Sequence, residues 1–358
     1  MKTTFEIAVF QGDGIGPEIM APTTDILSRF AAAGGYDLRF ADVPAGAAHY
    51  RATGESFPSA SMATARAADA ILLSAMGLPD VRYPDGTEIS PQIDLRKALT
   101  LFAGVRPVTI RPGQPTPLAT DRPVDFVLIR ESTEGLFYTQ GRGDVEADEA
   151  RETLRITRAI SEPLFRFAFD LAKSRKATGR GPGKVTCVDK ANVFRAFAFF
   201  REMFDAEAAK HPEIGANHAY VDATALWMVE KPWIFDVMVT ENMFGDILSD
   251  LGAGLMGGLG LAPSADIGHD HAVFQPCHGS APDIAGQGVA NPMAMLLSAA
   301  MMLEWLGGRH EVPAMVADGG RLRNAVDQVV ADAQVLTRDL GGHAGTAEVA
   351  AAVWDAVQ

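Results

Sequence analysis

The stretch from residue 7 to residue 30, IAVFQGDGIGPEIMAPTTDILSRF, carries the local pattern that decides the fold. Its apolar start, Ile7–Phe10, predicts a buried strand, and Gly12–Gly16 predicts a tight turn. Pro17 suits the first turn of a helix, where its missing N–H costs no hydrogen bond. The glycines are spaced G-x-G-x-G and a proline follows, which does not fit the G-x-G-x-x-G fingerprint of dinucleotide-binding folds. We therefore expect a strand, a tight turn and a helix of an α/β protein.

Short apolar runs and longer helical patterns alternate through the rest of the chain, which is typical of a mostly parallel sheet. Apolar residues from Ile156 to Leu171 repeat at helical spacing, and Pro163 is a candidate kink. Asn291-Pro292 begins a helix that is apolar nearly all round and is expected to end at Gly307-Gly308, so it belongs in the core. Further buried strands are expected at Ala70–Ser74, Asp125–Ile129, Lys184–Val188, Ala219–Val221 and Phe235–Val239.

The length and composition predict a soluble protein of two domains. The chain has 358 residues, with 31 Lys and Arg against 45 Asp and Glu, so its net charge is −14. Such an acidic chain does not suit a nucleic-acid backbone, and two cysteines cannot form a disulfide framework. We see neither a signal peptide nor a membrane span, and we expect a cytoplasmic protein. The candidate domain boundaries are the stretches Arg106–Pro117 and Gly252–Gly260, and their positions fit a central domain inserted into a discontinuous one.

Two aspartates four residues apart indicate a metal site. Asp246 and Asp250 lie in MFGDILSD, on one face of an expected helix, where their repulsion is unfavourable unless a cation lies between them. Hard divalent ions such as Mg²⁺ prefer carboxylate oxygens. A solvated helix face is the alternative, but the neighbouring residues are apolar. Asp222, at the end of another expected strand, is a candidate third carboxylate.

Three arginines indicate an acidic substrate. Arg96, Arg106 and Arg130 each lie at the edge of an apolar element in a chain of net charge −14. A single such arginine is usually a surface ion pair, whereas three together suggest bidentate binding of several carboxylates. Lys190 follows the strand Lys184–Val188, and near carboxylates and a metal its protonation state can be tuned for base catalysis. Taken alone, a lysine at this place favours a salt-bridge role over a catalytic one.

A glycine-rich polar loop runs from His278 to Pro292 with the sequence HGSAPDIAGQGVANP. Such a loop can bring backbone close to a phosphate or a ribose. A plain surface loop is the alternative interpretation.

Taken together, these segments resemble the β-decarboxylating 2-hydroxyacid dehydrogenases, a family that includes isopropylmalate, isocitrate, homoisocitrate, tartrate and D-malate dehydrogenases. The style of the motifs is nearest to 3-isopropylmalate dehydrogenase. The matching motifs are GDGIGPE at Gly12–Glu18, LRK at Leu95–Lys97, RP at Arg106-Pro107, IREST-EG at Ile129–Gly135, VDKAN at Val188–Asn192, YVDA at Tyr220–Ala223, ENMFGDILSD at Glu241–Asp250 and the loop at His278–Pro292.

The resemblance implies an isopropylmalate dehydrogenase-like fold of two α/β domains, with a mixed, mostly parallel sheet and no Rossmann βαβ. Residues 1–101 and 257–358 would form the discontinuous cofactor-loop domain, and residues 102–256 the central substrate and dimer domain. It also implies a homodimer with shared active sites, in which Lys190 and Asp222 act as catalytic residues on the other subunit. Asp222, Asp246 and Asp250 would bind Mg²⁺ or Mn²⁺.

The same resemblance assigns the binding residues for NAD and substrate. Asp283 lies where NAD-dependent members hold the adenosine ribose, and its carboxylate would repel the 2′-phosphate of NADP. Arg96, Arg106 and Arg130 would bind the malate carboxylates, and Asn192 would also contact the substrate. The expected cofactor-binding residues are His278, Gly279, Ser280, Ala281, Pro282, Asp283 and Asn291.

The chain departs from the family pattern at two positions. The tyrosine expected to protonate the product aligns with Phe137, and Tyr138 follows it, so Tyr138 is our candidate acid if a local bulge turns it inward; water is the alternative. With neither donor, oxidation without efficient decarboxylation would be the main activity. Gln275 stands where the family usually has a glutamate.

The substrate side chain would lie against Ser90, Gln92 and Ile93, which form a mixed polar and apolar set. We expect oxidation and decarboxylation of a 3-substituted malate, with 3-isopropylmalate as the first choice. Tartrate, D-malate and isocitrate remain alternatives, as does a noncatalytic regulatory subunit. The last is disfavoured because Lys190 and all three metal-site aspartates are present.

Overall fold

The computed structural model describes residues 2–111 and 113–357, so Met1, Pro112 and Gln358 of the expected domains lie outside the description. The strands are β1 (Thr4–Phe10), β2 (Asp37–Asp42), β3 (Ala70–Leu73), β4 (Ala103–Ile110), β5 (Val124–Glu131), β6 (Asp144–Val145), β7 (Ala150–Arg151), β8 (Lys184–Asp189), β9 (Gly215–Tyr220), β10 (Val237–Thr240), β11 (Pro263–Ile267) and β12 (Ala272–Pro276). The helices are α1 (Gly16–Gly34), α2 (Ala47–Thr53), α3 (Ser59–Ala67), α4 (Pro91–Ala98), α5 (Arg158–Ala177), α6 (Arg195–Ala208), α7 (Val221–Glu230), α8 (Asn242–Leu255), α9 (Met293–Arg309), α10 (Pro313–Asp332) and α11 (Thr346–Val357).

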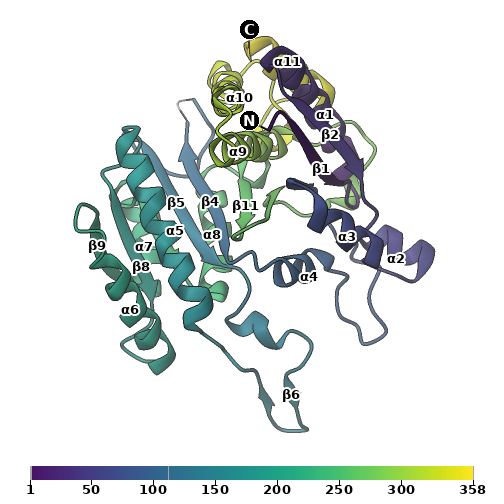
Figure 1. The fold of residues 1–358 in the computed structure, drawn as a ribbon. Coiled ribbons are helices and arrows are strands. Elements are labelled where there is room, and N and C mark those ends of the chain that lie inside the picture. The colour runs from purple at the N-terminus through teal and green to yellow at the C-terminus, as the bar shows by residue number, and fades with distance from the viewer. Residues whose placement is uncertain (1, 112, 358) are drawn as a thin grey trace.

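Ten strands form one mixed sheet in the order β2-β1-β3-β12-β11-β4-β5-β10-β8-β9. Most neighbouring strands are parallel, whereas β11 runs antiparallel to β12 and to β4, and β4 runs antiparallel to β5. The α/β class and the mostly parallel sheet are therefore confirmed, and the strand order is not that of a Rossmann βαβ fold. Figure 1 shows α1, α9, α10 and α11 gathered near β1, and α5 and α6 beside β5 and β8.

The middle of the sheet joins the segments that we expect to form separate domains. In the β4–β11 pairing, Gly104 lies opposite Asp266 and Val105 opposite Ala265. Gly104 is required there, because a Cβ at this position would lie 2.5 Å from the Ser132 hydroxyl. The first part of Arg106–Pro117, a candidate domain boundary in the sequence, therefore belongs to the central strand β4.

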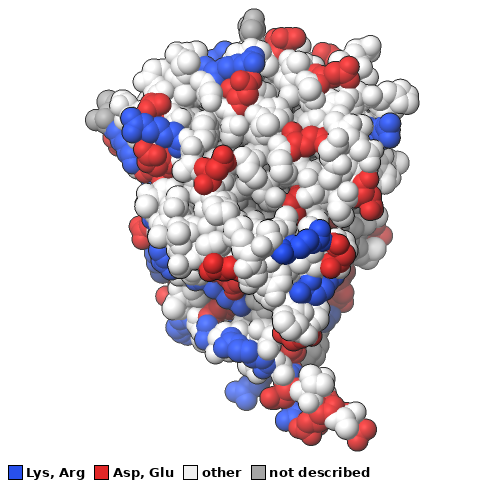
Figure 2. Space-filling model, turned by 90° about the vertical axis from the view of Figure 1, so that its right-hand side faces the viewer, with Lys and Arg blue, Asp and Glu red and all other residues white. Residues whose placement is uncertain are grey.

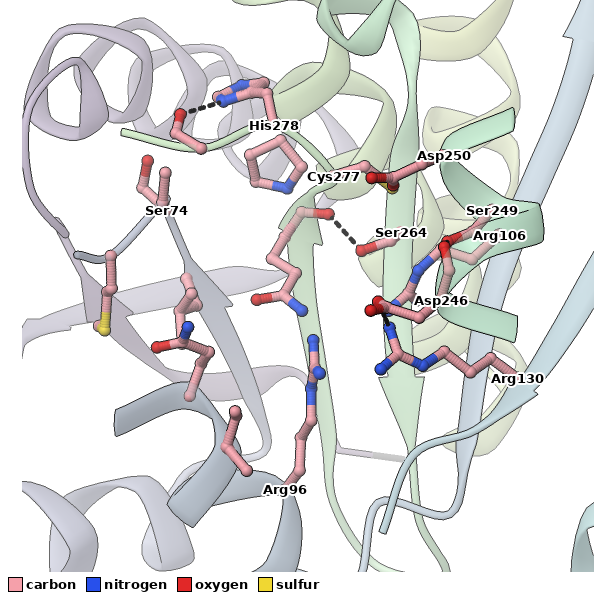
Figure 3. A pocket seen from close by; sticks show the side chains of 18 of the residues that line it. Ser74, Arg96, Arg106, Arg130, Asp246, Ser249, Asp250, Ser264, Cys277 and His278 are labelled. Carbon is pink, nitrogen blue, oxygen red and sulfur yellow. Dashed lines mark hydrogen bonds and ion pairs between the residues drawn. The ribbon is translucent and has the colours of Figure 1, made fainter. Parts of the chain in front are cut away.

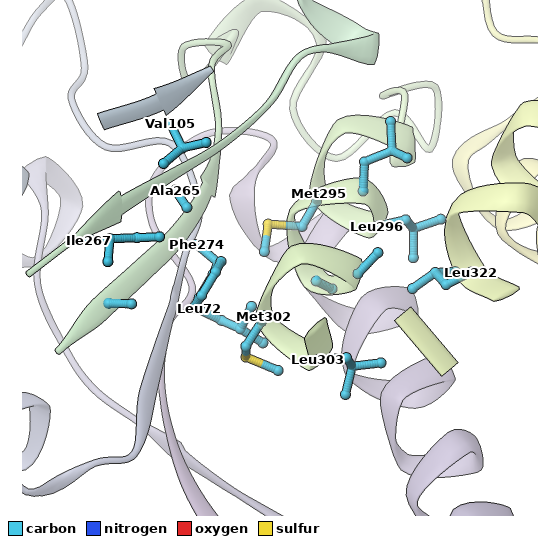
Figure 4. Packing of buried hydrophobic residues seen from close by; sticks show 14 of the residues in the cluster. Leu72, Val105, Ala265, Ile267, Phe274, Met295, Leu296, Met302, Leu303 and Leu322 are labelled. Carbon is cyan, nitrogen blue, oxygen red and sulfur yellow. The ribbon is translucent and has the colours of Figure 1, made fainter. Parts of the chain in front are cut away.

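The apolar helix predicted after Asn291-Pro292 is α9, and it is the central element of the core. It packs against β11 and β12 on one side and α10 on another, so almost its whole circumference is buried (Figure 4). The helix passes through Gly307-Gly308 rather than ending there. A Cβ on Gly307 would lie 2.7 Å from a Val316 methyl group, so this glycine allows α9 and α10 to approach closely.

The turn predicted at Gly12–Gly16 packs against the glycine-rich loop. The Ile15 amide donates to the Ser280 carbonyl at 2.8 Å, and a Cβ on Gly14 would lie 1.9 Å from the same oxygen. On α1, which begins at Gly16 as predicted, the Glu18 carboxylate accepts from the Ala290 amide at 2.8 Å. The opening motif therefore positions the loop that is expected to bind the cofactor.

One predicted strand is wrong at its end. Ala219–Val221 was expected to be extended, but β9 ends at Tyr220 and Val221 begins α7. Asp222 consequently lies in the first turn of a helix, where the helix dipole favours a carboxylate.

On the face shown in Figure 2, acidic and basic side chains are interspersed rather than gathered into a basic patch. Across residues 2–111 and 113–357, we find no helix with the combined length and apolarity needed to span a membrane.

Candidate active site

A cavity of about 280 Å³ opens at the middle of the sheet, where α4, β4, β5, α8, β11 and β12 meet (Figure 3). The predicted site residues that line it come from both of the expected domains. They are Gln92, Ile93, Arg96, Arg106, Arg130, Asp246, Asp250, His278 and Gly279. The structure therefore brings the three arginines and the two α8 aspartates to one place.

A buried carboxylate holds two of the arginines. Asp266, on β11, is 0% exposed and accepts from Arg96 Nε at 3.0 Å and from Arg106 Nη2 at 3.3 Å. Arg106 Nη1 also donates to the Ala265 carbonyl at 3.0 Å. These bonds fix one edge of each guanidinium, and Arg96 keeps its terminal nitrogens for a ligand in the cavity.

The third arginine is held from the other side. Arg130 Nε and Nη2 donate to the Asn242 side-chain oxygen at 3.0 and 2.7 Å, and Nη1 contacts Asp246. Burial, and then repulsion from Arg96, lower the pKa of Arg130 to about 10. It remains charged at neutral pH, and this crowding of cations favours an anionic ligand.

Asp246 and Asp250 lie one turn apart on α8, and both face the cavity. Glu241 caps this helix by accepting from the Phe244 amide at 2.8 Å, which fixes the position of its first turn. Burial, followed by repulsion from Asp246, raises the pKa of Asp250. A divalent cation between the two carboxylates would relieve that repulsion, so this donor set fits Mg²⁺ or Mn²⁺.

Lys190 and Asp222 lie together but outside this cavity. Lys190 Nζ donates to Asp222 Oδ1 at 2.6 Å, and the two side chains are 23% and 69% exposed. That hydrogen bond lowers the pKa of Asp222. Asn192, close to Lys190, is also exposed. Among the described residues of this single chain, no three His, Cys, Asp or Glu side chains form a metal-binding group, so Asp222 does not join Asp246 and Asp250 here.

His278, the first residue of the glycine-rich loop, lines both the main cavity and a second one of about 220 Å³. His278 Nε2 is buried without a hydrogen-bond partner within residues 2–111 and 113–357, and burial lowers the pKa of the ring. The second cavity is also lined by Ile15, Ile284, Val289 and Asn291. Two adjoining cavities with an unpaired ring nitrogen between them suit a ligand with two ends, as a dinucleotide has.

The remaining loop residues have distinct places. The Ser280 hydroxyl donates to the Gly77 carbonyl at 2.5 Å, and the Asn291 amide donates to Asp339 at 2.9 Å. Ala281, Pro282 and Asp283 are exposed to solvent.

Phe137, rather than Tyr138, lines the cavity. The Phe137 ring lies 5.1 Å from the Arg130 guanidinium. The Tyr138 ring lies under Arg155, at 3.7 Å, and beside Arg142, at 5.3 Å. The 3₁₀ turn Leu136–Thr139 therefore directs these neighbouring rings to different surroundings.

The expected substrate-side-chain residues are divided. Gln92 and Ile93 line the cavity, and Gln92 Oε1 is buried without a partner in the described part of the chain. The Ser90 hydroxyl lies outside the cavity and donates to the Glu88 carbonyl at 3.3 Å.

Sequence reasoning missed Asp266 and Asn242, the residues that hold the arginines. A single acidic residue in the apolar run LAPSADIG was a signal for Asp266, since a lone buried carboxylate needs a cationic partner. Asn242 lay within a recognised motif, but nothing in the sequence pointed to Arg130 as its partner.

Comparison with known proteins gives full-length matches. The isocitrate/isopropylmalate dehydrogenase family matches residues 6–353. The chain is 41% identical to the 3-isopropylmalate/3-methylmalate dehydrogenase of Methanocaldococcus jannaschii, over 96% of each chain. It is 40% identical to the 3-isopropylmalate dehydrogenase of Streptococcus thermophilus, over 98% of this chain and 99% of the relative. The crystal structure of isocitrate dehydrogenase from Methylococcus capsulatus superposes with a TM-score of 0.86 at 36% identity, covering 99% of both chains.

Proposed function

The chain belongs to the isocitrate/isopropylmalate dehydrogenase family and is therefore an oxidoreductase, and from this premise we propose its reaction. It oxidises and decarboxylates a 3-substituted malate, with 3-isopropylmalate as the first choice, using NAD and Mg²⁺ or Mn²⁺. The observation that carries this proposal is the cavity in which three arginines face two aspartates, with Ile93 and Gln92 beside them. The names of the full-length relatives support the same substrate.

The residues of the chain divide the work of binding and proton transfer. Arg96, Arg106 and Arg130 hold the substrate carboxylates through the N–H groups that their protein partners do not use. When bound to Asp246 and Asp250, a divalent ion would make the substrate hydroxyl more acidic, and NAD would accept the hydride. Lys190 Nζ takes the hydroxyl proton, and Asp222, which accepts its hydrogen bond, orients it.

The proposed enzyme is a homodimer whose active sites are shared, because Lys190 and Asp222 lie outside the cavity that they are expected to serve. Several exposed apolar side chains lie close to Lys190 or Asp222 in the sequence or on the helices α7 and α8. Exposed apolar residues of this kind are typical of a protein interface. These side chains are Val193, Phe194, Tyr220, Leu226, Val229 and Ile247. Association of two copies through these residues would cover them and place Lys190 and Asp222 beside the partner's aspartates.

We place the enzyme in the cytoplasm. Cys187 and Cys277 are both free, which suits a reducing compartment.

Tartrate is the second candidate substrate, and the Gln92 amide is the observation that favours it. The buried Gln92 Oε1 would accept a hydrogen bond from a substrate hydroxyl, whereas an alkyl group would leave it unpaired.

A substrate panel tests the proposal. NADH formation should be measured with Mg²⁺ or Mn²⁺ for 3-isopropylmalate, 3-methylmalate, tartrate, D-malate and isocitrate. We expect the highest kcat/KM for 3-isopropylmalate and loss of activity when a chelator removes the metal. A higher value for tartrate would transfer the assignment to the second candidate, and turnover of none would refute the dehydrogenase proposal.

A further inference from the structure

Asp266 is the fully buried carboxylate behind the arginines, and four side chains bind it. Besides Arg96 and Arg106, the Ser132 hydroxyl donates to it at 3.1 Å and the Gln275 amide donates at 2.7 Å. Burial alone would raise the pKa of Asp266, but the neighbouring arginines lower it below its ordinary value. Asp266 is therefore a permanent negative charge at neutral pH.

This charge changes what the arginines offer to a substrate. Arg96, Arg106 and Arg130 carry three positive charges, and Asp266 cancels one of them. Asp246 and Asp250 carry the two charges that would balance a divalent ion, so they leave the sum unchanged. The cavity wall then presents two positive charges, which match a malate with two carboxylates and an uncharged 3-substituent. A third carboxylate would be buried without a countercharge, which is strongly unfavourable.

We propose that Asp266 is a specificity-determining residue that sets this charge, so that the site selects a dicarboxylate and disfavours a tricarboxylate. The inference rests on the proposed function, which it deepens by naming the charge class of the substrate. Asp266 acts through the two arginines and does not itself line the cavity.

The neutral residue at position 275 belongs to the same arrangement. The Gln275 side chain donates its N–H to Asp266, so the amide stabilises the ionised carboxylate. A glutamate in this place would bring a second carboxylate within hydrogen-bond distance of Asp266. One of the pair would then have to bind a proton or repel the other.

The test compares binding of two acids, 3-isopropylmalate and isocitrate, by calorimetry in the presence of Mg²⁺, together with kcat/KM for each. The parent should prefer the dicarboxylate. Asp266→Asn keeps the size of the side chain and removes its charge, so the affinity for isocitrate relative to 3-isopropylmalate should rise about tenfold or more. A loss that is equal for both acids would show a merely structural role and would overturn the proposal.

Ser132→Ala is the matched control, because it removes a hydrogen bond from the same carboxylate without changing any charge. Its preference between the two acids should stay at the parental value. If Ser132→Ala changed the preference as much as Asp266→Asn, charge would not be the cause and the proposal would fail.

Gln275→Glu keeps the proposal testable if Asp266→Asn does not fold. Above neutral pH its additional carboxylate should weaken binding of 3-isopropylmalate, and lowering the pH should restore binding as the carboxylate pair takes up a proton. Binding that is independent of pH would count against the charge argument.

The parent enzyme separates failure of the proposed function from failure of the charge selection. If it binds the dicarboxylate more tightly than the tricarboxylate yet turns over neither acid, the proposed function fails while the charge selection stands. If it binds neither acid, the charge selection fails as well.

Discussion

The arginine cluster and the Lys190–Asp222 pair are built in opposite ways. Arg106 and Arg130 are each 5% exposed and are held by partners from several elements of the same chain. Asp222 is 69% exposed, and among the residues that the structure describes its side chain pairs only with Lys190. One chain thus completes the proposed substrate-binding half of the site, whereas the proposed proton-transfer pair lies outside the cavity of its own chain.

Electrostatics explains why this difference matters for function. Burying three guanidinium groups near one another is costly unless anions compensate, and Asp266 and Asp246 supply only part of that compensation. An exposed ion pair adds little to stability, so stability does not account for Lys190 and Asp222. The comparison supports the proposal that both features serve a ligand and that the exposed pair acts on a site of a second subunit.

Lys190→Ala should have the largest effect. Removing the proposed base should lower kcat by about 10²–10⁴-fold, and KM for the substrate should change much less. Steady-state kinetics with saturating NAD and Mg²⁺ would check this. An unchanged kcat would remove Lys190 from the mechanism.

Subunit mixing sharpens the same prediction. Inactive Lys190→Ala chains mixed with inactive Asp246→Ala chains should recover activity after subunit exchange, because one site in each mixed dimer is then intact. Each variant mixed with itself is the control. Confirmed mixed dimers that stay inactive would contradict the shared site.

Arg130→Lys should have the next largest effect. Lysine keeps the charge but cannot bind Asn242 and Asp246 together as the guanidinium does. Loss of one charge-assisted hydrogen bond to the substrate should raise KM by about 10–100-fold. Arg155→Lys is the matched control, since Arg155 pairs with Glu134 and stacks on Tyr138. A parental KM for Arg130→Lys would show that substrate binding does not depend on the planar guanidinium with its several N–H donors.

The preference for NAD should be smaller. The exposed Asp283 carboxylate would repel a 2′-phosphate, so kcat/KM for NAD should exceed that for NADP by about tenfold or more. Asp283→Asn should reduce this ratio, because it removes the repulsion of NADP and also a group expected to hold the adenosine ribose of NAD; kcat at saturating NAD should stay near the parental value. Equal use of both cofactors by the parent enzyme would contradict the assignment.

Local sequence predicted the elements better than their mutual arrangement. The strands β1, β3, β5, β8 and β10 and the helices α1, α5 and α9 follow from apolar periodicity and are present within a few residues. The antiparallel placement of β11 beside β4 depends on contacts between segments some 160 residues apart, which no local pattern encodes. The three arginines were predicted as a group because each lies in a recognisable motif. Asp266, which holds two of them, was missed because its position beside them depends on that non-local pairing.

The smallest effect is expected at Tyr138, where the structure and the family pattern diverge. A product carbanion needs a proton, and a phenol in the cavity would supply one, but the ring that lines the cavity is Phe137. Because Tyr138 lies between Arg142 and Arg155, we expect Tyr138→Phe to form protonated product at the parental rate, with water as the donor. Phe137→Tyr should instead speed this step, since it places a phenol next to Arg130. Single-turnover measurements that follow NADH and protonated product separately would check both variants. A large loss of product formation in Tyr138→Phe, with NADH formation intact, would show that Tyr138 reaches the cavity and acts as the acid.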